Sequence, residues 1–300
     1  MQIMRQSRLI ALLASTLLAA LPVSAQEEML HYSFNGYEAD IPADPQRVFV
    51  MESRTGLEFA LLAGYPIVAT DWDPSSHFEL DPAIDKLTFR AEPNAELALS
   101  YEPDLLVVGR GWWNHWQKNG AFTGDGFNVL VVEDANSGNW KQLMLDQLAA
   151  VGRVEKGEAA LAEYEAAVAA ARPIIAETLA DAPVAVADIW NNGQYVLHAE
   201  TFDAAVARDI GLNLVTGDVP VEDGYQPLSA ENLMAFADAE MIVLSTFNEE
   251  AVQNPMWLRL KAVQAGKVYD LHLANSWGFA LTATDFVHDL VGYARDAAGR

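Results

Sequence analysis

The chain has 300 residues, with 42 acidic and 18 basic side chains that give a formal net charge of −24, and it contains no cysteine. A surface of this charge repels nucleic acids and anionic lipid headgroups, so we expect no nucleic-acid partner. Without cysteine there is no disulfide framework, no thiolate metal site and no lipid-modified cysteine.

The first 25 residues predict a secretory signal peptide. Arg5 and Arg8 precede an apolar run over 9–21, and small residues follow up to Ala25. The run is too short for a membrane span, which needs about 20 apolar residues. Cleavage after Ala25 would release the mature chain into an exported space, and a periplasm fits this best.

Strand-like and helix-like segments then alternate along the chain. In the first half, the patterns predict strands over 47–51, 67–69, 105–108 and 129–132, a helix over 55–63 that stops at Gly64, and a helix over 140–151. In the second half, they predict strands over 184–189, 241–244 and 268–271, helices over 201–210 and 229–236, and a closing amphipathic helix over 282–297. Such alternation predicts an α/β fold of two lobes with mainly parallel sheets.

Between the halves, the alanine-rich segment Lys156–Ala180 predicts one long helix with a kink near Pro173. Its place at the midpoint favours a stiff strut that joins two lobes, with the ligand cleft between them. The expected organisation is a signal peptide at 1–25, an N-terminal lobe at 26–154, a linking helix at 155–181 and a C-terminal lobe at 182–300.

One short pattern occurs in both halves. Asn94-Ala95-Glu96 opens a helical segment that leads into the strand over 105–108, and Ser229-Ala230-Glu231 opens another that leads into the strand over 241–244. Each copy has a polar residue at the N-cap and a glutamate in the first turn. Two lobes that each present one glutamate at an equivalent place suggest a matched pair of charges for a partner.

Several stretches together resemble one known family. The segment 41–48, the motif at 94–105 and the segment 257–269 are similar to the helical-backbone class of periplasmic substrate-binding proteins, which serve ABC importers of ferric siderophores, haem and cobalamin. Within this class, 89–94 and 277–287 look most like the ferric hydroxamate receptors. The resemblance implies a monomeric, non-enzymatic receptor that captures a ferric siderophore and delivers it to an importer's permease subunits.

The resemblance also implies functional residues. The paired glutamates of the family correspond to Glu96 and Glu231, which would dock into arginine pockets on the two permease subunits. Each charge-assisted contact of this kind contributes about 1.5–3 kcal/mol. Arg90 corresponds to the arginine that binds the chelate oxygens, and Trp112 stands where the hydroxamate receptors have a ligand-binding tyrosine.

The chemistry of an iron chelate suggests further ligand contacts. Its clustered oxygens call for a planar cation, and its organic shell calls for aromatic walls. Arg54 and Arg110 follow predicted strands, where clefts of α/β proteins form. The aromatic candidates are Trp72, Trp113, Trp116 and Trp190 in loops after strands, Trp277 in the last cleft-facing segment, and Tyr225 in the loop before Ser229. Trp140 and Trp257 are expected in the core.

Three alternatives stay open on sequence grounds. Haem and cobalamin also suit an aromatic cleft, so the sequence separates them poorly from a siderophore. A bare metal ion is less favoured, because the six histidines form no His-x-His pair. An enzyme is least favoured, because hydrolase and nucleotide-binding motifs are missing and the acids Asp71 and Asp73 are expected to shape a turn. No cofactor is expected beyond the iron chelate that would be the ligand.

Overall fold

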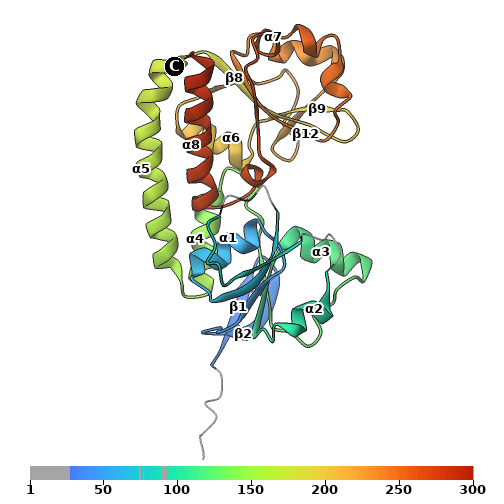
Figure 1. The fold of residues 1–300 in the computed structure, drawn as a ribbon, viewed down its shortest axis with the longest axis vertical. Coiled ribbons are helices and arrows are strands. Elements are labelled where there is room, and N and C mark those ends of the chain that lie inside the picture. The colour runs from blue at the N-terminus through green and yellow to red at the C-terminus, as the bar shows by residue number, and fades with distance from the viewer. Residues whose placement is uncertain (1–27, 74–75, 77, 89–92, 300) are drawn as a thin grey trace, which may run out of the picture.

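The computed structural model describes residues 28–73, 76, 78–88 and 93–299. The predicted signal peptide and Arg90 lie outside the described residues. The chain forms two lobes, one above the other, with two long helices along one side of the molecule (Figure 1). Among the helices of the described residues, none has the length and apolarity that crossing a bilayer requires.

The N-terminal lobe is built on a five-stranded, fully parallel sheet of order β5-β4-β3-β6-β7. Its strands are β3 (Val48–Val50), β4 (Ile67–Trp72), β5 (Asp85–Thr88), β6 (Leu105–Gly109) and β7 (Val129–Val132). An antiparallel hairpin of β1 (Met29–Phe34) and β2 (Tyr37–Pro42) precedes the sheet. Strand β4 extends through Asp71, so this residue does not shape the expected turn. Asp73 follows the strand, and its carbonyl accepts from the Ser76 N–H at 2.9 Å, as in a turn.

Side chains along these strands alternate between two cores, as a pleated sheet requires. Val48 and Val50 pack beneath α1 (Thr55–Ala63) and α4 (Trp140–Ala150). Phe49 and Met51 pack on the other face, beneath α2 (Ala95–Ser100) and α3 (Arg110–Asn119). The sheet is therefore buried on both sides, and only its edges and strand ends remain for function.

The C-terminal lobe has a mixed sheet of order β11-β9-β8-β12-β13, with β10 beside the start of β8. Its strands are β8 (Pro183–Ile189), β9 (Tyr195–His198), β10 (Asn213–Leu214), β11 (Tyr225–Leu228), β12 (Met241–Thr246) and β13 (Val268–Asp270). Strands β8, β10, β12 and β13 run parallel. Strand β9 pairs antiparallel with β8, and β11 pairs antiparallel with β9; the sequence patterns predicted neither strand.

Both α-helices and short 3-10 helices cover this second sheet. Helix α6 (Phe202–Asp209) packs on one face together with α8 (Ala280–Ala297). The other face is covered by the 3-10 helices η1 (Ala230–Phe236) and η3 (Trp257–Arg259) and by α7 (Lys261–Gln264). Two further 3-10 turns are η2 (Ala251–Gln253) and η4 (Leu273–Ser276). Trp140 and Trp257 are buried in the two lobes, which confirms their predicted place in the core.

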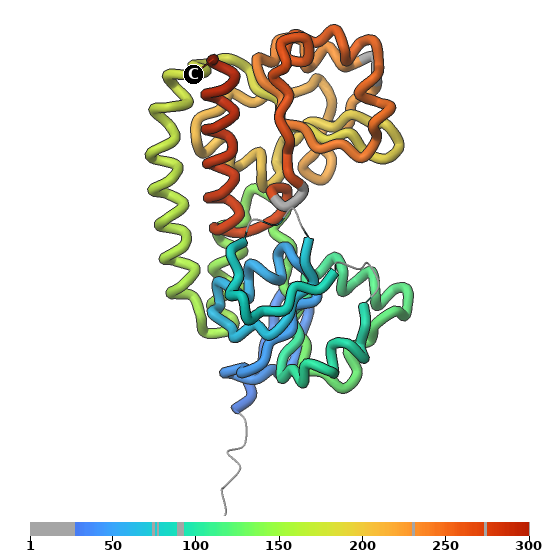
Figure 2. Tube along the Cα trace, in the orientation of Figure 1, coloured from blue at the N-terminus to red at the C-terminus, as the bar shows by residue number. Residues whose placement is uncertain are grey.

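Helix α5 (Val154–Thr178) runs along both lobes and continues through Pro173 (Figures 1 and 2). It packs against α8, α4 and α1 rather than standing alone. One buried apolar cluster consequently continues from the first lobe to the second through these helices. This shared core gives the long helix the support that a stiff connection between lobes needs.

A buried carboxylate adds a polar tie between the lobes. Glu58 of α1 accepts hydrogen bonds from the backbone N–H groups of Phe279 (2.6 Å) and Leu281 (2.7 Å) and from the Thr282 hydroxyl (2.7 Å). Glu58 thus satisfies the free N–H groups at the start of α8, where negative charge is favoured by the helix dipole. Burial nevertheless raises the pKa of Glu58 to about 7.

Candidate ligand-binding site

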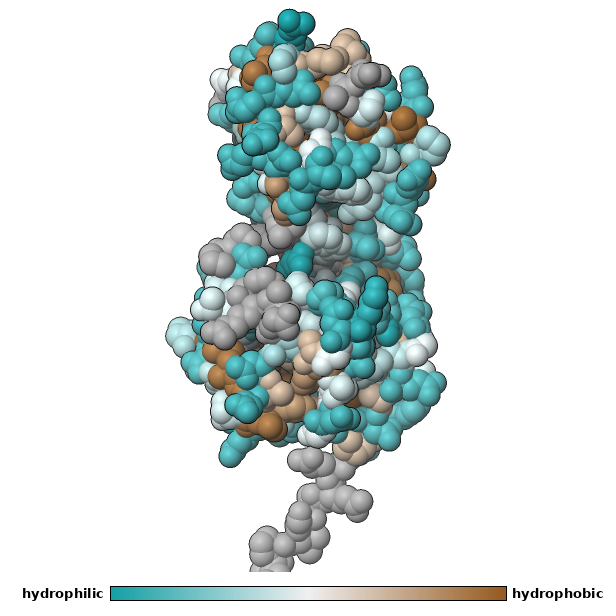
Figure 3. All heavy atoms as spheres, turned by 90° about the vertical axis from the view of Figure 1, so that its right-hand side faces the viewer, coloured by the Kyte–Doolittle hydropathy of each residue, from teal (hydrophilic) through white to brown (hydrophobic). Residues whose placement is uncertain are grey.

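A pocket of about 560 Å³ lies where three parallel strands of the first lobe end. It opens at the carboxyl ends of β3, β6 and β7, the edge at which α/β sheets generally bind ligands. Its lining consists of Glu52, Arg54, Thr55, Gly111, Trp112, His115, Asp134, Asn136 and Trp277. Figure 3 shows that the molecular surface is hollowed between the two lobes.

Arg54 and Trp277 form a stacked pair in this pocket. The guanidinium carbon of Arg54, at the start of α1, lies 4.7 Å from the centre of the Trp277 ring, which belongs to the segment before α8. Within the described part of the chain, no carboxylate pairs with this guanidinium at ion-pair distance. Stacking on an indole orients the cation while leaving its N–H donors available.

Two carboxylates meet at the floor of the same pocket. Glu52 is buried and accepts from the backbone N–H of Gly56 at 2.6 Å, and Asp134 accepts from Gly111 at 2.6 Å. A Cβ at Gly109 would lie 2.8 Å from the Glu52 Oε2 atom and 2.7 Å from the Asp134 Oδ1 atom, so a larger residue there would displace these carboxylates. Burial, together with the nearby charge of Asp134, raises the pKa of Glu52 to about 7.

A second pocket of about 420 Å³ lies between the sheet of the first lobe and helices α2 and α3. Among the described residues, both carboxylate oxygens of Asp71 are buried there without a hydrogen-bond partner. Burial, reinforced by the charge of Glu52, raises the pKa of Asp71 to about 8. The two pockets are neighbours, because the rings of Trp112 and Trp116, which line one pocket each, lie 5.9 Å apart.

The tryptophans after β6 lie on a helix, so the loop predicted for them is wrong. Helix α3 carries Trp112, Trp113 and Trp116 and ends at Gly120, whose φ of 66° is the left-handed conformation of a helix C-cap. Trp116 is buried in the core, and Trp113 packs edge-on against Tyr37. The i, i+4 spacing and the closing glycine were the sequence signals for this helix.

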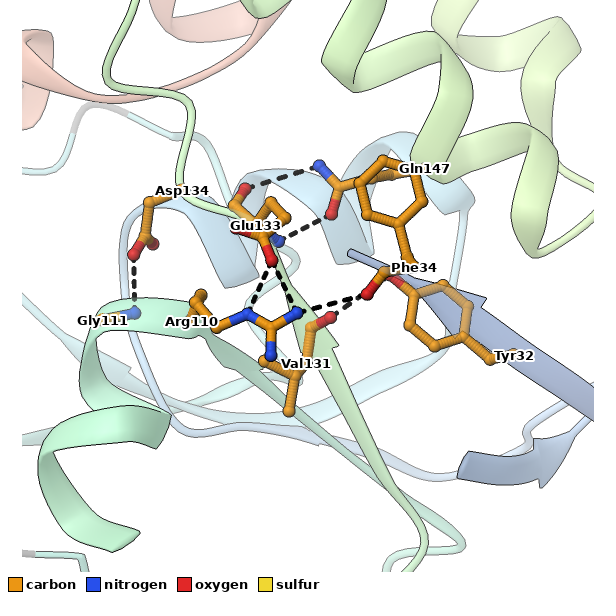
Figure 4. A network of polar contacts seen from close by, with 8 residues as sticks. All are labelled: Tyr32, Phe34, Arg110, Gly111, Val131, Glu133, Asp134 and Gln147. Carbon is orange, nitrogen blue, oxygen red and sulfur yellow. Dashed lines mark hydrogen bonds and ion pairs between the residues drawn. The ribbon is translucent and has the colours of Figure 1, made fainter. Parts of the chain in front are cut away.

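Arg110 has a structural partner instead of facing the pocket. Its guanidinium donates to Glu133 at 2.6 Å and to the carbonyl of Phe34 at 3.3 Å (Figure 4). Gln147 of α4 holds Glu133 in place by accepting from its backbone N–H at 2.6 Å. Arg110 also lies over the Tyr37 ring, so these contacts fasten the β1–β2 hairpin to the sheet. They do not support the expected ligand contact.

Three other aromatic candidates are not among the residues that line these two pockets. Trp72 ends β4 with the ammonium of Lys86 4.1 Å above its ring. Trp190 lies in the hairpin turn between β8 and β9, and its ring meets Tyr225 edge-on at 6.0 Å. Tyr225 itself begins β11, so its predicted loop position is wrong. Among the candidates, the structure brings together Arg54, Trp112 and Trp277.

A second charged cluster is buried within the C-terminal lobe. The Nδ1 atom of His198 lies 2.6 Å from a carboxylate oxygen of Asp203, and its Nε2 atom lies 3.2 Å from Asp188. Burial opposes the charged imidazole, but the carboxylates of Asp203 and Asp188 raise the pKa of His198 to about 10. His198 thus lies buried between two carboxylates, whose charges favour the protonated imidazole. Groups of three acidic or histidine side chains arranged to hold a metal ion are not found among the described residues.

The repeated motif occupies corresponding places in the two lobes. In α2, the side chain of Asn94 caps the helix by accepting from the Leu97 N–H at 2.9 Å, and Glu96 is exposed in the first turn. Glu231 lies in η1, which is a 3-10 helix without a side-chain cap. Each segment then leads into a central strand, β6 or β12.

The acidic residues of the pocket were not predicted from the sequence. Glu52 and Asp134 each lie two residues after the end of a strand, β3 and β7, and Asn136 lies two residues further on. Residues just after parallel strands meet at one edge of the sheet, whether they are arginines or acids. The position of these polar side chains just after strands is the sequence signal that indicates them.

Residues 59–273 match the family of periplasmic binding proteins, and the chain therefore belongs to that family. Its members are substrate-binding proteins and not enzymes. The chain is 22% identical over 269 residues to the iron-uptake system-binding protein of Bacillus subtilis, covering 85% of this chain and 83% of that protein. It is 21% identical over 261 residues to a probable siderophore-binding lipoprotein of the same organism, covering 79% and 78%.

Solved structures share the fold. FhuD2 of Staphylococcus aureus with bound ferrioxamine B superposes with a TM-score of 0.62 at 18% identity, covering 85% of this chain and 100% of that one. FhuD of Vibrio cholerae bound to Fe³⁺-Desferal gives a TM-score of 0.65 at 18% identity, covering 84% and 98%. These similarities establish the two-lobed binding-protein fold that the sequence predicted.

Proposed function

We propose that this protein is a periplasmic receptor that captures a ferric siderophore of the hydroxamate kind and delivers it to the permease of an ABC importer. Export would use a signal peptide cleaved after Ala25, and the mature receptor would act as a monomer. The main support is the stacked pair of Arg54 and Trp277, which lines a pocket at the lobe boundary together with Trp112. The two relatives with iron-uptake and siderophore-binding names support the same substrate class.

The pocket offers both kinds of contact that a ferric chelate needs. The guanidinium of Arg54 is oriented by its stacking on Trp277 and would donate hydrogen bonds to the clustered oxygens around the iron. The indoles of Trp112 and Trp277 would cover the organic shell. Because Glu52 and Asp134 also line the pocket, a neutral or positively charged chelate suits it better than a trianionic one.

Delivery would use Glu96 and Glu231 as docking points, one on each lobe. Glu96 is exposed on α2, and the repeated motif places Glu231 at the matching position of η1. Each glutamate would meet an arginine of one permease subunit, and two contacts would fix the register of receptor on permease.

Haem is the second candidate, because one observation favours it specifically. His115 lines the pocket and meets Trp112 edge-on, with 5.8 Å between the ring centres. A pocket with indole walls and an imidazole could hold a haem through its face and its iron. Cobalamin would use the same aromatic walls.

A fluorescence titration tests the proposal. Ferric desferrioxamine B, a ferric tris-catecholate, haem and cyanocobalamin would each be added to the mature protein, with iron-free desferrioxamine B as the control. We expect stoichiometric quenching of tryptophan emission by the ferric hydroxamate. A shifted haem absorption band together with no response to the ferric hydroxamate would favour the haem receptor instead. If none of the four ligands bound, the proposed function would be wrong.

A further inference from the structure

The two segments that carry Glu96 and Glu231 share a buried residue and an exposed apolar residue in addition to the glutamate. Four residues after the N-cap, each has a fully buried side chain, Ala98 in α2 and Leu233 in η1. One residue later, each has a large apolar side chain that is left in solvent. Leu99 is 55% exposed and Met234 is 67% exposed, and these are the two most exposed large hydrophobic side chains in the described part of the chain.

Helix geometry places each apolar side chain beside the docking position. Residues three apart are neighbours on the surface of an α-helix, so Leu99 follows Glu96 on one face of α2. In a 3-10 helix, residues three apart lie almost above one another, so Met234 stands one turn after position 231. The same pairing of acid and exposed hydrophobe therefore occurs once on each lobe.

Neither lobe needs these two side chains for its own stability. Helix α2 packs on its sheet through Ala98, and η1 packs through Leu233, so each helix already has a buried anchor. A single exposed hydrophobe on a protein surface is common. Two of them at the same offset from equivalent glutamates, in lobes whose sheets differ in topology, point to a shared partner.

We propose that each lobe docks through a two-part contact, made of a glutamate and the apolar residue three positions after it: Glu96 with Leu99 and Glu231 with Met234. The partner is the dimeric permease of the proposed function, on which this inference rests. It would present two equivalent sockets, each with a basic group beside apolar surface. A net charge of −24 on the chain favours basic sockets and disfavours a second copy of the same chain as the occupant.

The apolar residue has a physical role beyond its own contact area. An ion pair at an exposed rim is weak, because water and salt screen it. A hydrophobic side chain packed next to the pair excludes water from one side and strengthens it, as energetically neutral contacts do around interface hot spots. Leu99 and Met234 would therefore make the docking less sensitive to salt than two isolated glutamates.

The test measures docking and ligand binding separately. The receptor loaded with ferric desferrioxamine B would be titrated onto its cognate importer in nanodiscs, with affinity and stimulation of ATP hydrolysis as readouts. The test variant is Leu99→Ser with Met234→Ser. The matched control is Leu258→Ser with Met256→Ser, which removes a leucine and a methionine that are 46% and 38% exposed and lie outside the repeated motif. A third variant replaces both docking glutamates by alanine.

We expect at least about tenfold weaker docking for Leu99→Ser with Met234→Ser, and a steeper loss at high salt, because the ion pairs lose their apolar cover. Binding of ferric desferrioxamine B should be unchanged, and the control pair should dock within about twofold of the wild type. If the serine variant docked as tightly as the wild type, this inference would be wrong. The proposed function would still stand in that case, provided that the glutamate variant lost docking. If the serine variant instead lost only self-association, the surface would bind a second copy, which also contradicts the inference.

Discussion

The two lobes differ in the partners that they provide for buried titratable side chains. In the N-terminal lobe, Glu52 and Asp134 line a pocket whose arginine, Arg54, stacks on an indole. Nearby, the buried oxygens of Asp71 have no hydrogen-bond partner within the part of the chain that the structure describes. In the C-terminal lobe, His198 lies between Asp188 and Asp203 inside the fold. The first lobe holds a buried carboxylate that lacks a hydrogen-bond partner among the described residues beside an open pocket. The second lobe instead places two carboxylates around its buried imidazole, although Asp188 Oδ1 also lacks a hydrogen-bond partner among the residues described there.

This difference suggests a role in ligand binding for the acids of the first lobe and a structural role for His198 in the second. Burial raises the pKa of Glu52 and of Asp71, so these groups are held in surroundings that disfavour their charge. Such perturbation near a pocket is typical of functional sites. The carboxylates around His198 instead offset the cost of burying an imidazolium. Changes in the second lobe should therefore affect stability, and changes in the first should affect ligand binding.

The largest expected effect is on stability, from His198→Ala. Removing the imidazolium leaves Asp203 buried without its charged partner, which costs about 3–5 kcal/mol of unfolding free energy for a broken buried pair. Urea unfolding followed by circular dichroism measures this loss. His115→Ala, in the pocket, is the control and should change stability by less than about 1 kcal/mol. Equal losses for both variants would contradict the division between lobes.

The same cluster predicts a dependence of stability on pH. Folding raises the pKa of His198 from 6.5 to about 10, so its contribution is complete below pH 6.5 and is lost as the pH rises towards 10. The wild type should therefore lose unfolding free energy across this range. Unfolding midpoints in denaturant, measured from pH 6 to pH 10, should fall more steeply for the wild type than for His198→Ala. If the midpoints of both proteins fell equally with pH, His198 would not be charged in the folded state.

Arg54→Ala should weaken binding of ferric desferrioxamine B at least about tenfold, because the chelate oxygens lose an oriented cation. Arg54→Lys should give an intermediate loss, since it keeps the charge but not the planar stacking on Trp277. The exposed Arg259→Ala serves as the control, and fluorescence titration is the measurement. An affinity unchanged by Arg54→Ala would mean that this pocket does not hold the ligand.

The charge of the ligand should have a smaller effect on affinity, which also tests the binding role of the first lobe. The wild type should bind cationic ferric desferrioxamine B more tightly than a ferric tris-catecholate, because Glu52 and Asp134 face the pocket. Asp134→Asn should narrow this preference by several-fold, whereas Asp125→Asn, on an exposed loop, should leave it unchanged. Tighter binding of the catecholate by the wild type would contradict the role given to the acids.

The smallest expected change is in overall shape. The shared apolar core along α5 and α8, together with the bonds from Glu58 to the start of α8, should keep the lobes in place when ligand binds. Small-angle X-ray scattering with and without ferric desferrioxamine B should give closely similar profiles. A large compaction on binding would show that these helices do not hold the lobes apart.

Much of the fold was predictable because its signals are local. The helix Thr55–Ala63 was predicted with its observed bounds, since Gly64 adopts the left-handed conformation that ends a helix. Strand β7 was likewise predicted as Val129–Val132, from a short apolar run. The hairpin of β1 and β2 and the strands β9 and β11 were missed, because such short strands are stabilised chiefly by the strands with which they pair.

The candidate site was predictable only in part. Arg54, Trp112 and Trp277 were identified by residue type and by position after strands, and the structure places all three in one pocket. Arg110 met the same criteria, yet Glu133 binds its guanidinium on the other side of the strand end. Position along the chain does not specify which nearby carboxylate an arginine will reach.

By itself, the sequence determined the alternation of elements, the two matched halves and the long joining helix, because periodicity and capping act between near neighbours. Only the tertiary structure decided which side chains meet. Arg54 stacks on Trp277 and Glu58 binds the start of α8 because packing brings together two segments that lie far apart in the sequence, and such long-range contacts leave no periodic trace in it.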